Sequence, residues 1–126
     1  MKAVELSTEG VRARTRRGQS TDEAVLRAKQ VEKLRTRFTL VENKVIDRGP
    51  VDLYIRVIGP DGNVMSSMQD PMGGTPYTIK ETVDYTNKDT PVEVSWSKGT
   101  AFEPGNYSVE VYHSGSLIGK SSVTLK

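Results

Sequence analysis

Three methionines are the residues of this 126-residue chain with the most specific candidate chemistry. Met65, Met68 and Met72 follow one another at short spacing in a stretch that also carries glycine and proline. Thioether sulfur is a preferred ligand of Cu(I), so these three side chains are candidate copper ligands. Methionine more commonly packs a loop or forms an adaptable contact surface. We favour that second use and expect no metal site and no cofactor.

Acidic and amide side chains offer a second candidate metal site. Asp84, Asn87 and Asp89 could converge on Ca²⁺ through their oxygen atoms. Asp and Asn also stabilise turns through their own side chains, and this is the expected role of these three residues.

Catalytic groups are scarce in the sequence. His113 is the single histidine, there is no cysteine, and no G-x-S-x-G motif marks an activated serine. A histidine acts in a triad only beside a nucleophile and an orienting acid, and the sequence indicates neither partner. We therefore expect no catalytic residues and a protein that is not an enzyme.

Charge divides the chain into two unequal parts. Residues 1–49 carry 12 Lys and Arg against 7 Asp and Glu, whereas residues 50–126 carry 6 against 9. The basic part has no aromatic residues interleaved among its arginines to stack on bases, so we expect no nucleic-acid partner. No apolar run approaches the length of a membrane span, and none resembles a signal peptide, so any leader is absent from this chain.

The elements that must position these residues begin with an N-terminal segment, residues 1–33. Ser20 and Glu23 have the spacing of a helix capping box, and Ala24, Ala28 and Val31 follow at helical spacing. The pattern predicts a basic arm at residues 1–19 and a short helix over residues 21–33. We expect this segment either to pack on the following domain or to form the end of a coiled-coil stalk.

From residue 34 onward the period of the apolar residues changes to two, which is typical of half-buried strands. Glu81 falls on an inward position, so we expect a bulge there or the edge of a sheet. Residues 66–75 have no period and form the longest predicted loop. The seven predicted strands, all in a domain spanning residues 34–126, lie within residues 34–41, 51–58, 64–65, 77–85, 92–96, 107–112 and 117–125.

The last two strands give the most specific local signal. Pro104 and Gly105 precede Tyr107, which opens an alternating strand, and Gly115 supplies a turn before the closing strand begins at Leu117. This corner resembles the one in immunoglobulin-like and fibronectin type III-like domains, where a Tyr hydroxyl bonds back to the backbone. The fold class that we expect is all-β: a seven-stranded antiparallel immunoglobulin-like sandwich preceded by the short N-terminal helix and basic arm.

The stretch of residues 53–62, the corner and the return at residues 115–120 together resemble the C-terminal sandwich of bacterial envelope proteins that carry a helical stalk. The resemblance implies a non-enzymatic structural or protein-interaction module of the cell envelope, exported to the periplasm or the envelope, with a cytoplasmic location left open. It also implies a protein partner or self-association through the N-terminal helix. Loops on a rigid scaffold commonly carry binding residues. The expected binding-loop residues are Met68, Gln69, Asp70 and Met72.

A carbohydrate-binding sandwich is the alternative function. Tyr54, Tyr85 and Tyr112 would stack on a sugar if one sheet face carried them together. Ordinary cross-strand packing is the competing explanation for these rings.

Overall fold

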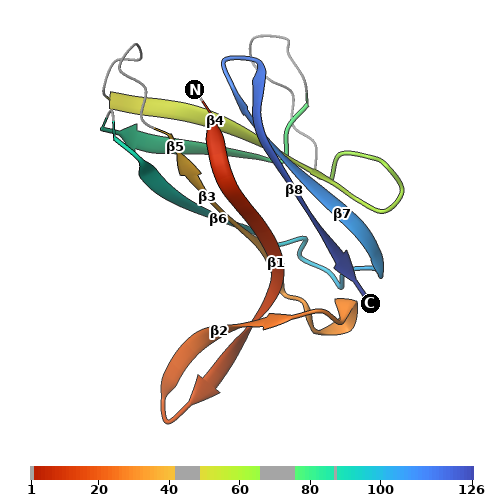
Figure 1. The fold of residues 1–126 in the computed structure, drawn as a ribbon. Helices are drawn as coiled ribbons and strands as arrows, with labels where there is room; N and C mark the ends of the chain where they lie inside the picture. The colour runs from red at the N-terminus through yellow and green to blue at the C-terminus, as the bar shows by residue number, and fades with distance from the viewer. Residues whose placement is uncertain (1, 42–48, 66–75, 87) are drawn as a thin grey trace.

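The computed structural model describes residues 2–41, 49–65, 76–86 and 88–126. In these residues the chain forms β-strands and a single turn of 3₁₀-helix, η1, with no α-helix (Figure 1). No helix long and apolar enough to cross a membrane occurs in the same residues. The elements are β1 (Ala3–Arg16), β2 (Gln19–Val25), η1 (Ala28–Gln30), β3 (Lys33–Leu40), β4 (Gly49–Ile58), β5 (Ile79–Tyr85), β6 (Thr90–Trp96), β7 (Gly105–His113) and β8 (Ser116–Leu125).

The strands form two four-stranded sheets that share one core. Sheet A has the order β2-β1-β3-β6, and sheet B has the order β5-β4-β7-β8. Every neighbouring pair is antiparallel. The expected all-β class and two-sheet arrangement are confirmed, but the expectation of seven strands preceded by a helix is wrong.

The core is built from the alternating strands, as the period of two predicts. On β4, the side chains of Val51, Leu53, Ile55 and Val57 are all buried. They form one cluster with the inward residues of β7 in the same sheet and of β3 and β6 in the other sheet. Because one face of each strand is apolar, a slip of one residue in register would move that whole set into water. The burial pattern therefore fixes the register of the central strands.

The N-terminal segment is where the fold departs most from expectation. Residues predicted as an arm and a helix form β1, β2 and the three-residue η1 instead. The predicted helix over residues 21–33 is wrong. β2 pairs with β1 in a ladder that begins where Arg16 faces Gln19 and ends where Gly10 faces Val25. The backbone groups that a helix would bond internally are therefore used in strand pairing. The turn of η1 begins after Arg27, with no side-chain cap.

Two further details differ at strand ends. Val64 forms only an isolated bridge with Ile58, where a short strand was expected. In the closing strand the register shifts, so that Ile118 is buried while Leu117 is 51% exposed. Glu81 lies on β5 at the edge of sheet B in unbroken register with β4, which confirms the edge and excludes the bulge.

The two sheets meet along β1 and β8. A side chain at Gly119 of β8 would come within 2.8 Å of Leu6 on β1, and one at Gly10 of β1 would come within 3.3 Å of Leu125. The earlier residue of β1, Leu6, thus lies near the earlier residue of β8, Gly119, and the later residues Gly10 and Leu125 lie near each other. β1 and β8 therefore run in the same direction. The last residue joins the two layers: the amide of Lys126 donates to the carbonyl of Leu26 at 2.7 Å.

Candidate functional site

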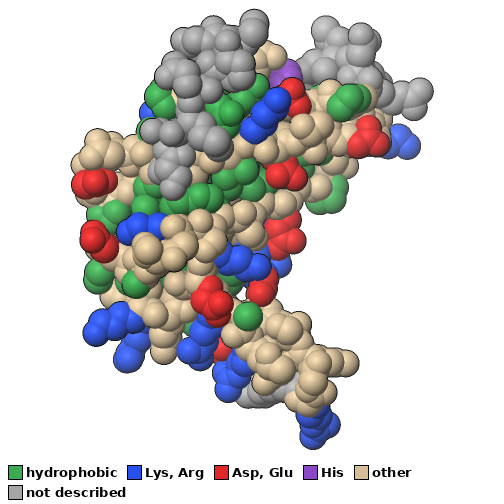
Figure 2. Space-filling model, turned by 180° about the vertical axis from the view of Figure 1, so that it is seen from behind, with side chains coloured by type: hydrophobic (Ala, Val, Ile, Leu, Met, Phe, Trp, Pro, Cys, Tyr) green, Lys and Arg blue, Asp and Glu red, His purple; other side chains and the backbone are tan. Residues whose placement is uncertain are grey.

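A β-hairpin extends from sheet A beyond its other strands. The pairing of β1 with β3 ends at Val11 and Lys33, so the residues of β1 past that point pair only with β2. We call residues 12–23 the hairpin arm. Its described side chains between Ala13 and Asp22 are all exposed. Figure 1 shows the arm leaving the body of the molecule, and Figure 2 shows it projecting with a basic side chain at its tip.

A two-residue turn sets the geometry of the arm. Arg17 and Gly18 have φ angles of 51° and 78°, and Arg16 pairs with Gln19 across them. Positive φ at both central positions is the signature of a type I′ turn, whose twist matches that of a hairpin. The signal that sequence reasoning missed was this Arg-Gly pair between two alternating polar stretches.

Ion pairs cross-link the arm and its base. Glu23 accepts hydrogen bonds from Arg12 Nε at 3.2 Å and from Arg14 Nη1 at 3.0 Å. The bond from Arg12, followed by that from Arg14, holds the pKa of the Glu23 carboxyl below its ordinary value of 4.5. At the base of the arm, Lys33 Nζ lies 3.1 Å from Asp22. The charges of the arm are thus largely paired on its flanks.

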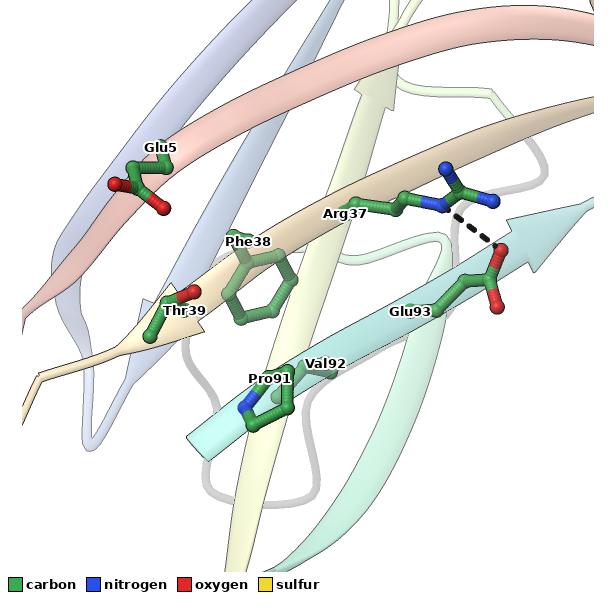
Figure 3. Close-up of a pocket in the computed structure, with 7 residues that line it drawn as sticks. All are labelled: Glu5, Arg37, Phe38, Thr39, Pro91, Val92 and Glu93. Atoms are coloured by element: carbon green, nitrogen blue, oxygen red, sulfur yellow. Dashed lines mark hydrogen bonds and ion pairs between the residues drawn. The ribbon is translucent and has the colours of Figure 1, made fainter. Parts of the chain in front are cut away.

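The ion pairs continue across the outer face of sheet A. Arg35 is hydrogen-bonded to Glu9, and this bond raises the pKa of the guanidinium. A shallow hollow of about 480 Å³ lies beside these ion pairs. In it Arg37 and Glu93 point toward each other, with Arg37 Nε 3.2 Å from Glu93 Oε1 (Figure 3). Its rim includes Glu5, which has a φ of 56° in the bulge of β1. The lining supplies carboxylates and a guanidinium but no group placed as a nucleophile.

The outer face of sheet B carries two of the three tyrosines proposed for sugar stacking. Tyr54 and Tyr112 are direct cross-strand partners on β4 and β7. Tyr85 does not join them, because it shares the inward positions of β5 and is fully buried in the core. Tyr77, which is buried, packs edge-on against Tyr54 with ring centroids 4.9 Å apart.

Charged groups flank the half-buried rings of Tyr54 and Tyr112. The guanidinium of Arg56 lies 5.7 Å from the centre of the Tyr112 ring and donates to the Tyr112 hydroxyl at 3.2 Å. The same group pairs with Glu110 at 3.1 Å. On the other side, Lys80 Nζ lies 5.8 Å from the centre of the Tyr54 ring. This face therefore combines aromatic surface with hydrogen-bonding groups, which is the chemistry that a sugar requires.

The other candidate residues fall into two groups. Met68, Gln69, Asp70, Met72 and Asn87 lie outside the described residues. Met65 is half-buried and packs against the core. No cluster of three or more His, Asp or Glu side chains suited to a metal is found in the described part of the chain, which includes Asp84 and Asp89.

The environments of His113 and Tyr107 indicate roles in the fold. Burial lowers the pKa of His113, which favours its neutral form at the end of β7. The Tyr107 hydroxyl donates to the carbonyl of Glu103 at 2.7 Å and accepts from the amide of the same residue at 3.1 Å. The predicted tyrosine corner is confirmed, and its hydroxyl serves the fold.

Of the comparisons with known proteins, one found a match, and it covers nearly the whole chain. No curated protein and no solved structure matches the chain. One family model matches residues 7–126, a range that includes the hairpin arm, both sheets and the tyrosine corner. The chain therefore belongs to the family described as "Domain of unknown function (DUF8428)".

Proposed function

We propose that this protein is a non-enzymatic structural and protein-interaction module that self-associates through its hairpin arm. The observation that carries the proposal is the arm itself, whose described side chains between Ala13 and Asp22 are exposed on both faces. A two-stranded hairpin without an apolar face gains little stability from its own fold. An ordered arm of this kind is best explained by contacts that it makes outside the chain.

The setting that we propose is the bacterial cell envelope, with an immunoglobulin-like or fibronectin type III-like sandwich as the scaffold. Two observations support the scaffold. With β2 set aside, sheet A orders its strands as A, B and E of an immunoglobulin domain, and sheet B orders them as C′, C, F and G. The hydroxyl of Tyr107 also bonds to Glu103 at the start of the strand in position F.

Shortening the arm tests its role. Arg12 and Glu23 are cross-strand partners, so replacing residues 13–22 by Asn-Gly closes the hairpin earlier with a two-residue turn. We expect the natural chain to associate in sedimentation equilibrium at about 1 mM and the shortened chain to stay monomeric. The control is Arg17→Asn, which keeps both the length of the arm and its turn. Equal association of the shortened chain, or a natural chain that is monomeric at this concentration, would refute the proposal.

A carbohydrate ligand on sheet B is the second candidate, favoured by the pairing of Tyr54 with Tyr112. Stacking of an aromatic side chain on a nucleobase is worth on the order of 1–3 kcal/mol by alanine substitution, and with the same range for a sugar Tyr112→Ala should weaken binding by roughly 5- to 150-fold. Tyr112→Phe keeps the ring and should retain most of the affinity. A glycan array with the natural chain provides the ligand, and an array without a retained glycan removes this candidate.

A further inference from the structure

The outer edge of β2 presents unpaired backbone groups along the hairpin arm. Residues that flank a two-residue turn form a hydrogen-bonded pair, and such pairs then alternate along the hairpin. Since Arg16 and Gln19 flank the turn, the backbone groups of Gln19, Thr21 and Glu23 point toward β1. The backbone amides and carbonyls of Ser20, Asp22 and Ala24 therefore point away from β1, toward the free edge.

Two hydrogen bonds on the other strand support this assignment independently. The amide of Ala13 donates to Glu32 Oε1 at 2.7 Å, and the carbonyl of Val11 accepts from the amide of Glu32 at 2.9 Å. Ala13 and Val11 belong to the cross-strand pairs that exchange no backbone hydrogen bonds with β2, so their backbone groups point away from β2. Glu32 thus covers the free side of β1 beside Val11 and Ala13, so this edge of the arm is partly covered while the edge of β2 is open.

The remaining edges of the two sheets carry features that prevent pairing with another strand. Pro91 interrupts the donors of β6, Glu81 places a carboxylate on the inner face of β5, and β8 lies against β1. β2 has no proline, no lysine and no bulge in its seven residues. An edge that lacks such protection is a template for an added strand.

We propose that β2 pairs with β2 of a second copy in antiparallel orientation, about a two-fold axis at Asp22. This inference rests on the proposed self-association and names the surface that performs it. The three outward residues are symmetric about Asp22, so Asp22 would face the partner's Asp22 while Ser20 faces the partner's Ala24. All six outward backbone groups of each copy are then bonded, and the two A sheets become one continuous sheet. The interface is isologous, as a two-fold dimer requires.

Charge is compatible with this register. Two Asp22 carboxylates would lie next to each other, which is unfavourable for bare like charges. Each carboxylate, however, is already paired in its own chain, with Lys33 Nζ at 3.1 Å and Arg35 Nη1 at 3.9 Å. Seven residues a side make a small interface, so we expect a weak dimer with a dissociation constant of about 0.1 mM.

Engineered cysteines test the register, because the natural chain contains none. Hydrogen-bonded antiparallel partners have Cα atoms about 5.5 Å apart, a separation that a disulfide bridges. Asp22→Cys should therefore cross-link to a dimer on oxidation, and a mixture of Ser20→Cys with Ala24→Cys should cross-link to a heterodimer. Ser20→Cys alone is the matched control, because its two copies would lie about 14 Å apart along the strands.

A proline variant tests the hydrogen bonds. Ala24→Pro removes an outward amide and no bond within the hairpin, so it should weaken association at least tenfold in sedimentation equilibrium. Ala24→Ser keeps the amide and should associate as the natural chain does, and amide NMR spectra check that each arm is intact. The inference is overturned if Asp22→Cys cross-links no faster than Ser20→Cys, or if Ala24→Pro associates normally. Should the shortened arm still abolish association in that case, the proposed function stands and only the β2 pairing falls; a monomeric natural chain overturns both.

Discussion

Removal of the Tyr107 hydroxyl by Tyr107→Phe is the sharpest test of how the fold is held together. The ring is fully buried and its hydroxyl bonds both backbone groups of Glu103, at 2.7 and 3.1 Å. Phenylalanine keeps the ring and its contact with Phe102, whose centroid lies 5.8 Å away. The substitution therefore removes two hydrogen bonds and leaves the packing unchanged.

The magnitude follows from those two bonds. Each is worth about 1 kcal/mol net, and a backbone group left without a partner costs about 1–3 kcal/mol more. Because Glu103 is exposed, water replaces part of the loss, and we expect the free energy of unfolding to fall by about 1.5–3 kcal/mol. Over 126 residues, the unfolding entropy of about 2.1 cal/mol/K per residue converts this loss to a melting temperature lower by about 6–11 °C.

Urea denaturation measures the effect as a lower midpoint with an unchanged slope. Tyr112→Phe is the matched control, because Tyr112 is half-exposed on the outer face of sheet B, where its hydroxyl donates to Glu110 and accepts from Arg56, both at 3.2 Å. We expect that control to cost under about 1 kcal/mol. A loss below about 0.5 kcal/mol for Tyr107→Phe, or equal losses for the two variants, would show that the corner does not stabilise the fold as argued.

Three further substitutions probe the edges and turns. Gly105→Ala should destabilise by about 2–4 kcal/mol in urea, since Gly105 has a φ of 143° and a Cβ there would lie 2.6 Å from Pro60; a loss below about 1 kcal/mol contradicts the strain. Arg12→Gln should raise the titration midpoint of Glu23, followed by carboxyl NMR, back toward 4.5. Because the folded pKa of Glu23 is lowered, the ion pair stabilises the arm fully above the ordinary value of 4.5, and this stabilisation is lost as the pH falls through the folded pKa. An unchanged titration midpoint in Arg12→Gln would argue against the pairing. Glu81→Val should increase light scattering during refolding, because it removes the inward charge from the edge strand β5; equal scattering would mean that another feature protects this edge.

The central strands are predictable from sequence because a single physical requirement shapes them. Alternation of buried and exposed positions on β3 and β4 follows from one apolar face per strand, and Phe38 and Leu53 on these faces are buried. Tyr107 was identified for a similar reason, since the preceding Pro104 and Gly105 allow only a narrow set of turns.

The N-terminal segment was not predictable in the same way. Ser20 and Glu23 have the spacing of a helix cap, and local spacing cannot reveal that β2 instead pairs with β1. The competing information is non-local, because Val25 pairs with Gly10, fifteen positions earlier. Tertiary pairing of this kind overrides weak local preference.

In the candidate sites, too, some features follow from local alternation and others depend on contacts between distant segments. Alternation was enough to put Tyr54 and Tyr112 on outward positions, but only the pairing of β4 with β7 makes them neighbours. The contact of Tyr77 with Tyr54 and the partly covered edge at Glu32 depend on how distant segments meet. No local pattern encodes such contacts.

The parallel course of β1 and β8 has a mechanical consequence. Tension applied between the start of β1 and the end of β8 would act along both strands, from opposite ends of the seam where the two sheets meet (Figure 1). The ladders of β1 with β3 and of β7 with β8 lie perpendicular to that tension, so their hydrogen bonds would be loaded together in shear, whereas unzipping would break them one at a time. The hairpin arm branches away from this line of force and could keep its contacts while the sandwich is under strain.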